Sequence, residues 1–159
     1  MPSPKQSPRG RRRRLTDFVS HDPEQAAVDC EVISTQIIPQ NTSSKDPFWE
    51  NRARDFLWAF SLAVALSEPP ERRNLATVME MLALPVNFPD GAQDKAYCRS
   101  PTLAMLARLR RLAAEFDMPA LGQTAVAIES GLGSRTDSVF DTARRFCRFS
   151  RVRHGSAMR

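Results

Sequence analysis

The stretch DPFWENRARDFLWAFSLAVAL, residues 46–66, has the strongest periodic pattern in the chain. Its apolar residues recur at steps of three and four, as on one face of an α-helix, and its charged residues fall on the other face. Towards residue 66 the stretch becomes apolar on all sides, which is typical of a helix surrounded by other helices. The apolar positions are Trp49, Ala53, Phe56, Leu57, Phe60, Ala63 and Val64. We therefore expect this helix to lie at the centre of a helical bundle.

Prolines and capping residues divide the rest of the chain into further helices. Proline favours the first turn of a helix, and a preceding Ser, Asp or Asn side chain can cap the free backbone N–H groups there. No segment alternates with the period of two that a strand requires. The predicted helix starts are Asp22-Pro23, Asp46-Pro47, Asn74, Ser100-Pro101, Pro119 and Ser134. The sequence therefore predicts an all-α fold, a bundle of about six helices.

The net charge of +5 is concentrated at the two ends of the chain. Residues 1–14 carry six basic residues and no acid, and residues 151–159 carry three more arginines. Residues 15–150 hold 14 basic and 18 acidic residues, a net charge of −4. The folded part is therefore expected to be mildly acidic, so the net charge alone does not indicate a nucleic-acid-binding domain.

We predict one domain, residues 20–150, between a disordered basic arm, residues 1–19, and a disordered tail, residues 151–159. The arm has too few large apolar residues to offset the entropy of ordering it. Its arginine run can bind phosphates through charge, although such a run can also be only a solubilising leader. The predicted nucleic-acid contacts in the arm are Arg11, Arg12, Arg13 and Arg14.

The residues that carry enzymatic chemistry are few and scattered. His21 and His154 are the two histidines of the chain, and neither has a Cys or carboxylate at metal-ligand spacing. No glycine is followed by lysine, so no phosphate-cradling loop that ends in a lysine is present, and we interpret the glycines of residues 131–135 as a helix stop followed by a cap. The three cysteines, Cys30, Cys98 and Cys147, lie far apart, and we expect inert thiols in a reducing, cytoplasmic setting. We therefore predict no enzyme, and no catalytic, cofactor-binding or metal-ligating residue.

One hypothesis for binding is a helix-turn-helix in a small helical DNA-binding regulator. The fifth and sixth predicted helices would form a hairpin, with Ala127 four residues before Gly131, as in that motif. The motif also needs an apolar residue about six positions after the glycine, where Asp137 stands, and Val139 comes two positions too late. The predicted phosphate contacts on the sixth helix are Arg144, Arg145 and Arg148.

The other hypothesis comes from a resemblance that covers roughly residues 20–150. The segment KDPFWENRARDFL, residues 45–57, resembles the start of the helical domain in type IV secretion coupling proteins, the conjugative DNA-translocating ATPases. RNLATV, residues 73–78, is similar to the family's RTLATV segment, and SVFDTAR, residues 138–144, is similar to its SVLSTAR helix. The residues that carry the resemblance are Asp46, Pro47, Phe48, Trp49, Asn74, Leu75, Thr77, Val78, Ser138, Val139, Thr142, Ala143 and Arg144.

The resemblance implies a scaffold without catalytic groups. In the family this all-α lobe is inserted within the nucleotide-binding domain and is implicated in recognising the relaxosome or the transferred DNA–protein substrate. It implies here a non-catalytic recognition lobe or a truncated fragment, in the cytoplasm or at the cytoplasmic face of the bacterial inner membrane. The expected partners are a relaxase or another relaxosome protein, or DNA, with no cofactor.

Departures from the family pattern lie at both edges of the resemblance. Asp137 stands where the family often has a small residue, and residues 149–154 replace the expected continuation. A lobe cut from its motor domain should expose an apolar underside and self-associate. A remnant that folds and binds nothing is a third hypothesis. The longest apolar run, residues 56–66, is too short to span a membrane, which takes about 20 residues.

Overall fold

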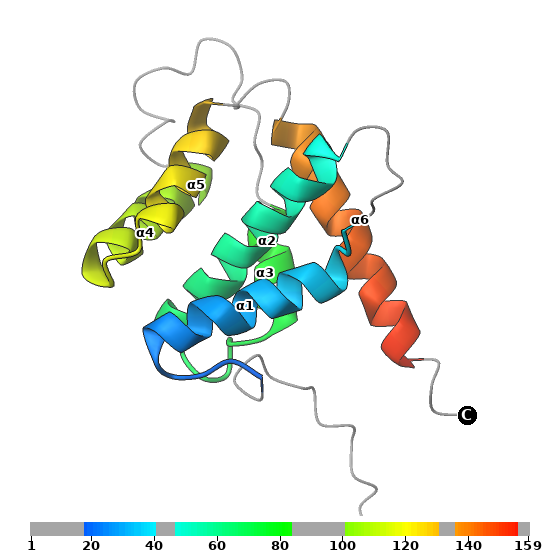
Figure 1. The fold of residues 1–159 in the computed structure, drawn as a ribbon, viewed down its shortest axis with the longest axis horizontal. Helices are drawn as coiled ribbons and strands as arrows, with labels where there is room; N and C mark the ends of the chain where they lie inside the picture. Colours follow the sequence, from blue (N-terminus) through cyan, green and yellow to red (C-terminus); the bar gives the residue numbers. More distant parts are fainter. Residues whose placement is uncertain (1–17, 41–46, 84–100, 131–135, 156–159) are drawn as a thin grey trace, which may run out of the picture.

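A computed structural model gives the structure of the chain and describes residues 18–40, 47–83, 101–130 and 136–155. These residues form six α-helices and no β-strand (Figure 1), which confirms the predicted all-α fold. The helices are α1 (Pro23–Ile37), α2 (Phe48–Ser67), α3 (Leu75–Leu82), α4 (Pro101–Glu115), α5 (Pro119–Ser130) and α6 (Thr136–Gly155).

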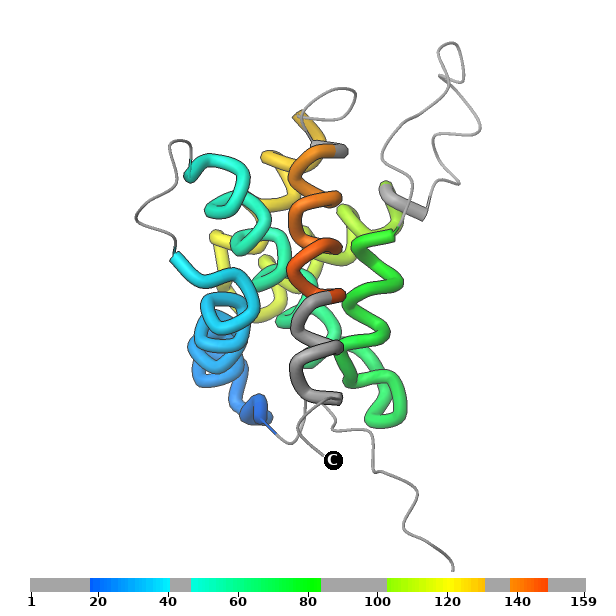
Figure 2. The backbone as a smooth tube through the Cα atoms, turned by 90° about the vertical axis from the view of Figure 1, so that its right-hand side faces the viewer, coloured from blue at the N-terminus to red at the C-terminus, as the bar shows by residue number. Residues whose placement is uncertain are grey.

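The helices form three layers, with α2 in the middle one. Helix α2 contacts each of the other five helices. Figure 2 shows α6 in front, flanked by α1 and α3, with α4 and α5 behind. Every residue from Ala59 to Val64 is buried. This part of α2 is surrounded by other helices, as its lack of a polar face predicted.

Phenylalanine side chains join α2 to α6. Phe140 of α6 is fully buried, and its ring centroid lies 5.3 Å from that of Phe56 and 5.8 Å from that of Phe60. These separations are in the range of favourable aromatic pairs. The two helices therefore share the largest side chains of the core.

Helix α1 is fixed to α2 by two hydrogen bonds, one to its second turn and one to the residue after its last turn. Asp22 caps α1 by accepting a hydrogen bond from the Gln25 backbone N–H at 2.9 Å, as predicted. Trp58 Nε1 donates to the Ala27 carbonyl at 3.0 Å, and Arg54 Nε donates to the Ile38 carbonyl at 2.9 Å. Pro39 then follows the end of the helix, where proline removes a backbone donor.

The folded part extends further than the predicted domain limits at both ends. Val19, assigned to the N-terminal arm, is buried in the core, because Ser20 already bonds to Asp29 and holds this stretch against α1. Helix α6 runs to Gly155 and includes the first residues of the predicted tail. No proline or glycine interrupts the sequence between residues 136 and 154, so nothing in it ends the helix at residue 150.

Helices α4 and α5 form the hairpin that the sequence analysis assigned to α5 and α6. Helix α5 packs chiefly against α4, whereas α6 packs against α2 and α3, so the predicted α5–α6 hairpin is wrong. The turn after Glu115 explains this pairing. Asp117 adopts a left-handed conformation with φ of 52°, and the Met118 N–H donates to the Ala113 carbonyl at 2.9 Å, which reverses the chain within three residues.

Predicted caps agree with the structure where it describes them. Asn74 caps α3 by accepting from the Thr77 backbone N–H. Asp46, Ser100 and Ser134 lie outside the described residues, and α2 begins after Pro47 without a side-chain cap.

Candidate functional site

The sixth helix carries the predicted phosphate contacts that the structure describes. Arg145 and Arg148 are exposed on α6, and no acidic partner lies beside either among the described residues. Arg144 is half-buried, and its guanidinium group already has two partners. Its Nη2 contacts Asp141 Oδ1 at 2.7 Å, and its Nε donates to the Phe140 carbonyl at 3.3 Å. Two of the three arginines are therefore free to bind an anion. The arm residues Arg11, Arg12, Arg13 and Arg14 lie outside the described part.

The three segments that the sequence analysis singled out, residues 45–57, 73–78 and 138–144, come from helices that pack together. They lie on α2, α3 and α6, and each of these helices contacts the other two. Thr77, Val78, Val139 and Ala143 are buried where these helices meet. Trp49 and Leu75 are partly buried and pack against the core. Asp46 lies outside the described residues. The remaining residues that the sequence analysis named in these segments lie toward the surface or at helix ends: Pro47, Phe48, Asn74, Ser138, Thr142 and Arg144.

Two of the three cysteines are buried in the core, on α1 and α6. Burial raises the pKa of the Cys30 thiol to about 12, with a smaller contribution from the charge of Asp29. Burial raises the pKa of the Cys147 thiol to about 11. Both groups therefore stay neutral thiols near pH 7, and neither is a nucleophile in the folded chain. Cys98 lies outside the described residues.

An ion cluster around Glu68, which the sequence analysis did not anticipate, joins α4 to the end of α2. Arg108 Nη1 lies 2.7 Å from Glu68 Oε1, and Arg72 Nε lies 3.0 Å from Glu68 Oε2. Partial burial raises the pKa of Glu68, but the hydrogen bonds and charges of Arg108 and Arg72 outweigh it and hold the pKa below its usual value. Arg108 Nε also donates to Ser67 Oγ at 2.7 Å. This cluster stabilises the arrangement of helices.

A groove runs between α1, α2 and α5. It has a volume of about 510 Å³ and is lined by Val28 and Glu31 of α1, Arg52 and Arg54 of α2, and Thr124 of α5, among others. The groove is open and lined by both polar and apolar side chains, so it resembles a contact surface more than an enclosed substrate site.

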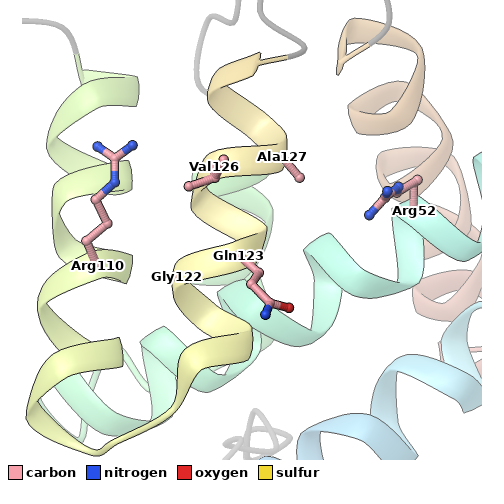
Figure 3. Close-up of a pocket in the computed structure, with 6 residues that line it drawn as sticks. All are labelled: Arg52, Arg110, Gly122, Gln123, Val126 and Ala127. Atoms are coloured by element: carbon pink, nitrogen blue, oxygen red, sulfur yellow. The ribbon is translucent and has the colours of Figure 1, made fainter.

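A second hollow continues the groove across α5. Gln123 and Ala127 of α5 project toward Arg52, while Val126 lies on the side of α5 that faces Arg110 of α4 (Figure 3). Arg110 itself is paired with Glu129. Val126 is 56% exposed, and Val28 at the other edge of the groove is 52% exposed. The hollow and the groove therefore each have an exposed valine in their lining, Val126 in the hollow and Val28 in the groove.

The exposed acidic residues of α1 were not predicted as a site, although a count of charges along each helix would have found them. Residues 18–40 contain four acidic residues and no Lys or Arg. Glu24, Val28, Glu31 and Val32 are exposed and stand at the spacing of one helix face. We call these four residues the acidic face of α1.

No protein family, curated protein or solved structure matched the chain in the comparisons made. Within the described part, no three His, Cys, Asp or Glu side chains gather closely enough to hold a metal ion. Among the same residues, no helix is both long and apolar enough to cross a membrane.

Proposed function

We propose that this chain is a non-catalytic recognition lobe of the type IV secretion coupling kind. In this proposal it binds a relaxosome protein, or the DNA–protein substrate of conjugative transfer, at the cytoplasmic face of the inner membrane. The observation that supports the proposal is the convergence of α2, α3 and α6, because the three segments on which the resemblance depends pack on one another as parts of one scaffold would.

The distribution of exposed groups supports binding over chemistry. The thiols of Cys30 and Cys147 are buried and held neutral, whereas Arg145 and Arg148 are exposed. Guanidinium groups on a helix surface suit phosphate oxygens and neutralise charge without reading base sequence. The α6 surface is thus a suitable contact for the DNA strand of a nucleoprotein substrate.

Fluorescence anisotropy with a labelled 20-nucleotide single strand, alone and bound by a purified relaxase, tests this function. We expect the full chain to bind the relaxase-bound strand more tightly than the free strand. Replacing Arg145 and Arg148 together by Ala should lower the slope of log K against log salt by about 1.4, since each lost phosphate contact removes about 0.7 for single strands.

The matched control is Arg111→Ala, compared with Arg145→Ala. Arg111 is an exposed arginine of α4 on a different layer of the molecule, so its loss changes the net charge equally. The proposal is wrong if Arg111→Ala and Arg145→Ala have the same effect, or if neither form of the strand binds. Preference for one duplex sequence would instead indicate a DNA-binding regulator, and ATP hydrolysis by the purified chain would contradict both functions.

A further inference from the structure

Residues 18–40, which include the acidic face of α1, are the most negatively charged of the four described stretches. Of the four described stretches, residues 18–40 carry a net charge of −4, residues 47–83 carry −1, residues 101–130 carry none and residues 136–155 carry +3. Within the described residues, the carboxylates of Glu24 and Glu31 have no ion-pair partner. A positively charged segment would therefore prefer α1 to any other described helix.

Apolar side chains accompany these acids. Val28 and Val32 are 52% and 51% exposed and lie at positions i+4 and i+8 from Glu24, between or beside the two carboxylates. A side chain that packs on the valines can thus bring its charged end to a carboxylate. Long arginine side chains do this well, because their aliphatic stems cover apolar surface while their guanidinium groups pair with acids.

The chain before α1 is directed along this helix. Asp22 caps the start of α1, yet the Ser20 backbone N–H donates to Asp29 Oδ2 at 2.8 Å. Residue 20 therefore lies beside residue 29, almost two turns along the helix, and Val19 is buried there. The described chain thus begins alongside α1 and not beyond the end of the helix.

The basic residues of this segment can reach every part of α1. Arg14 is four residues before Phe18, within about 14 Å of it, and Lys5 is within about 45 Å in an extended chain. Helix α1 has 15 residues and a length of about 22 Å. A tether of this length gives an effective concentration of the order of millimolar, which makes even weak ion pairs count.

We propose that the basic segment Lys5 to Arg14 binds in cis to the acidic face of α1, and that nucleic acid competes with α1 for it. Six basic residues without an acid then meet a helix that has three acids and no Lys or Arg. The docked segment has fewer free guanidinium groups, so α1 lowers the affinity of the arm for phosphates. The intramolecular contact is independent of the proposed function, whereas the competition rests on it.

Paramagnetic relaxation enhancement in the full chain tests the contact. A nitroxide is attached at Ser7→Cys in a Cys98→Ser background, where the buried Cys30 and Cys147 stay unlabelled. At 50 mM NaCl, where the screening length is about 14 Å, we expect the backbone amide signals of Val28, Glu31 and Val32 to lose intensity. At about 1 M NaCl, where the screening length is about 3 Å, the intensity should return.

A matched pair of charge-reversal variants identifies the docking surface. E24K/E31K should restore the α1 signals at low salt, whereas E71K/E115K, which changes the same net charge at exposed acids elsewhere, should not. Far-UV circular dichroism establishes that both variants are folded. The contact is refuted if the unreversed chain shows no α1 enhancement at low salt, or if E71K/E115K releases the segment as well as E24K/E31K does.

Anisotropy with the free 20-nucleotide strand tests the competition. If the segment is docked in about three quarters of the molecules, its release raises the apparent affinity about fourfold. E24K/E31K should therefore bind about fourfold more tightly than E71K/E115K, with net charge held equal. Equal affinities together with the α1 enhancement would overturn the competition and leave the contact standing. If neither variant binds the strand, the competition fails together with DNA binding by the arm, while the enhancement still decides the contact.

Discussion

At the scale of single residues, two serines of α2 have opposite environments. Ser61 is fully buried and its hydroxyl has no hydrogen-bond partner in the described structure. A buried hydroxyl without a partner costs about 1–3 kcal/mol, and alanine is the better helix former. Ser61→Ala should therefore stabilise the fold by about 1 kcal/mol or more, measured as a higher midpoint of urea unfolding with an unchanged slope.

Ser67→Ala is the matched control within the same helix. The Ser67 hydroxyl donates to the Ala63 carbonyl at 2.6 Å and accepts from Arg108 Nε at 2.7 Å. Its loss leaves the half-buried guanidinium with one partner fewer, so Ser67→Ala should destabilise by about 1–2 kcal/mol. Equal shifts for the two variants would show that helix propensity alone decides.

Asp117 is the residue that turns α4 into α5, and its backbone is strained. Its φ of 52° is in the left-handed region, which is unfavourable for residues with a Cβ atom although Asp tolerates it better than most. Asp117→Gly should relieve this strain and stabilise by about 0.5–1 kcal/mol, net of the greater backbone entropy of glycine. Thermal unfolding followed by circular dichroism measures the shift, and Asp117→Ala, which keeps the Cβ atom, should give no gain.

At the scale of elements, the sequence predicted which residues of a helix face inward better than which helix they face. The period of α2 and the caps at Asp22 and Asn74 are local features, and the structure confirms them. The pairing of α5 depends on the backbone of Asp117, and that of α4 on Arg108 reaching Glu68 forty residues away. Such contacts leave no periodic trace in the sequence, so the α5–α6 hairpin was predicted wrongly.

The Glu68–Arg108 pair makes the docking of α4 on α2 depend on pH. The folded-state pKa of Glu68 lies below its ordinary value of 4.5, so the pair contributes its full stability above about pH 4.5. That contribution is lost as the pH falls through the lower, folded-state pKa. Glu68→Gln should cost about 1–3 kcal/mol at pH 7 and should flatten the decline of the free energy of unfolding at lower pH.

Glu80→Gln provides the comparison, because Glu80 also pairs with Arg72 but its side chain is 62% exposed. An exposed pair contributes about 0–1 kcal/mol, so this variant should follow the unsubstituted chain at every pH. Urea unfolding at pH 3, 5 and 7 measures all three proteins. If the free energy of unfolding of Glu68→Gln changed with pH in parallel with that of the unsubstituted chain, the Glu68 carboxylate would not cause the pH dependence.

At the scale of the whole molecule, the candidate site separates into a predicted and an unpredicted part. Arg145 and Arg148 on α6 were predicted from their positions in the sequence and are exposed. Arg144 was also predicted, but its side chain forms an ion pair with Asp141, three residues earlier. The groove between α1, α2 and α5 could not be predicted, since it depends on how far α5 stands from α1. The charge of the acidic face of α1 can be counted from the sequence alone. The direction in which residues 18–22 run along α1 can be learned only from the structure.

The cooperativity of the molecule can be measured through its two buried thiols. Cys30 on α1 and Cys147 on α6 lie on different helices, and with a thiol pKa of about 11 or 12 they react with Ellman's reagent only after exposure. Because α2 packs against both helices, we expect one opening event and equal labelling rates for the two thiols in a Cys98→Ser background. Phe140→Ala should cost about 3–5 kcal/mol and accelerate both rates by the same factor, about 100-fold or more. Mass spectrometry of the labelled peptides measures the two rates separately. Acceleration of Cys147 alone would mean that α6 opens independently of α1 and that packing on α2 does not make the two helices unfold together.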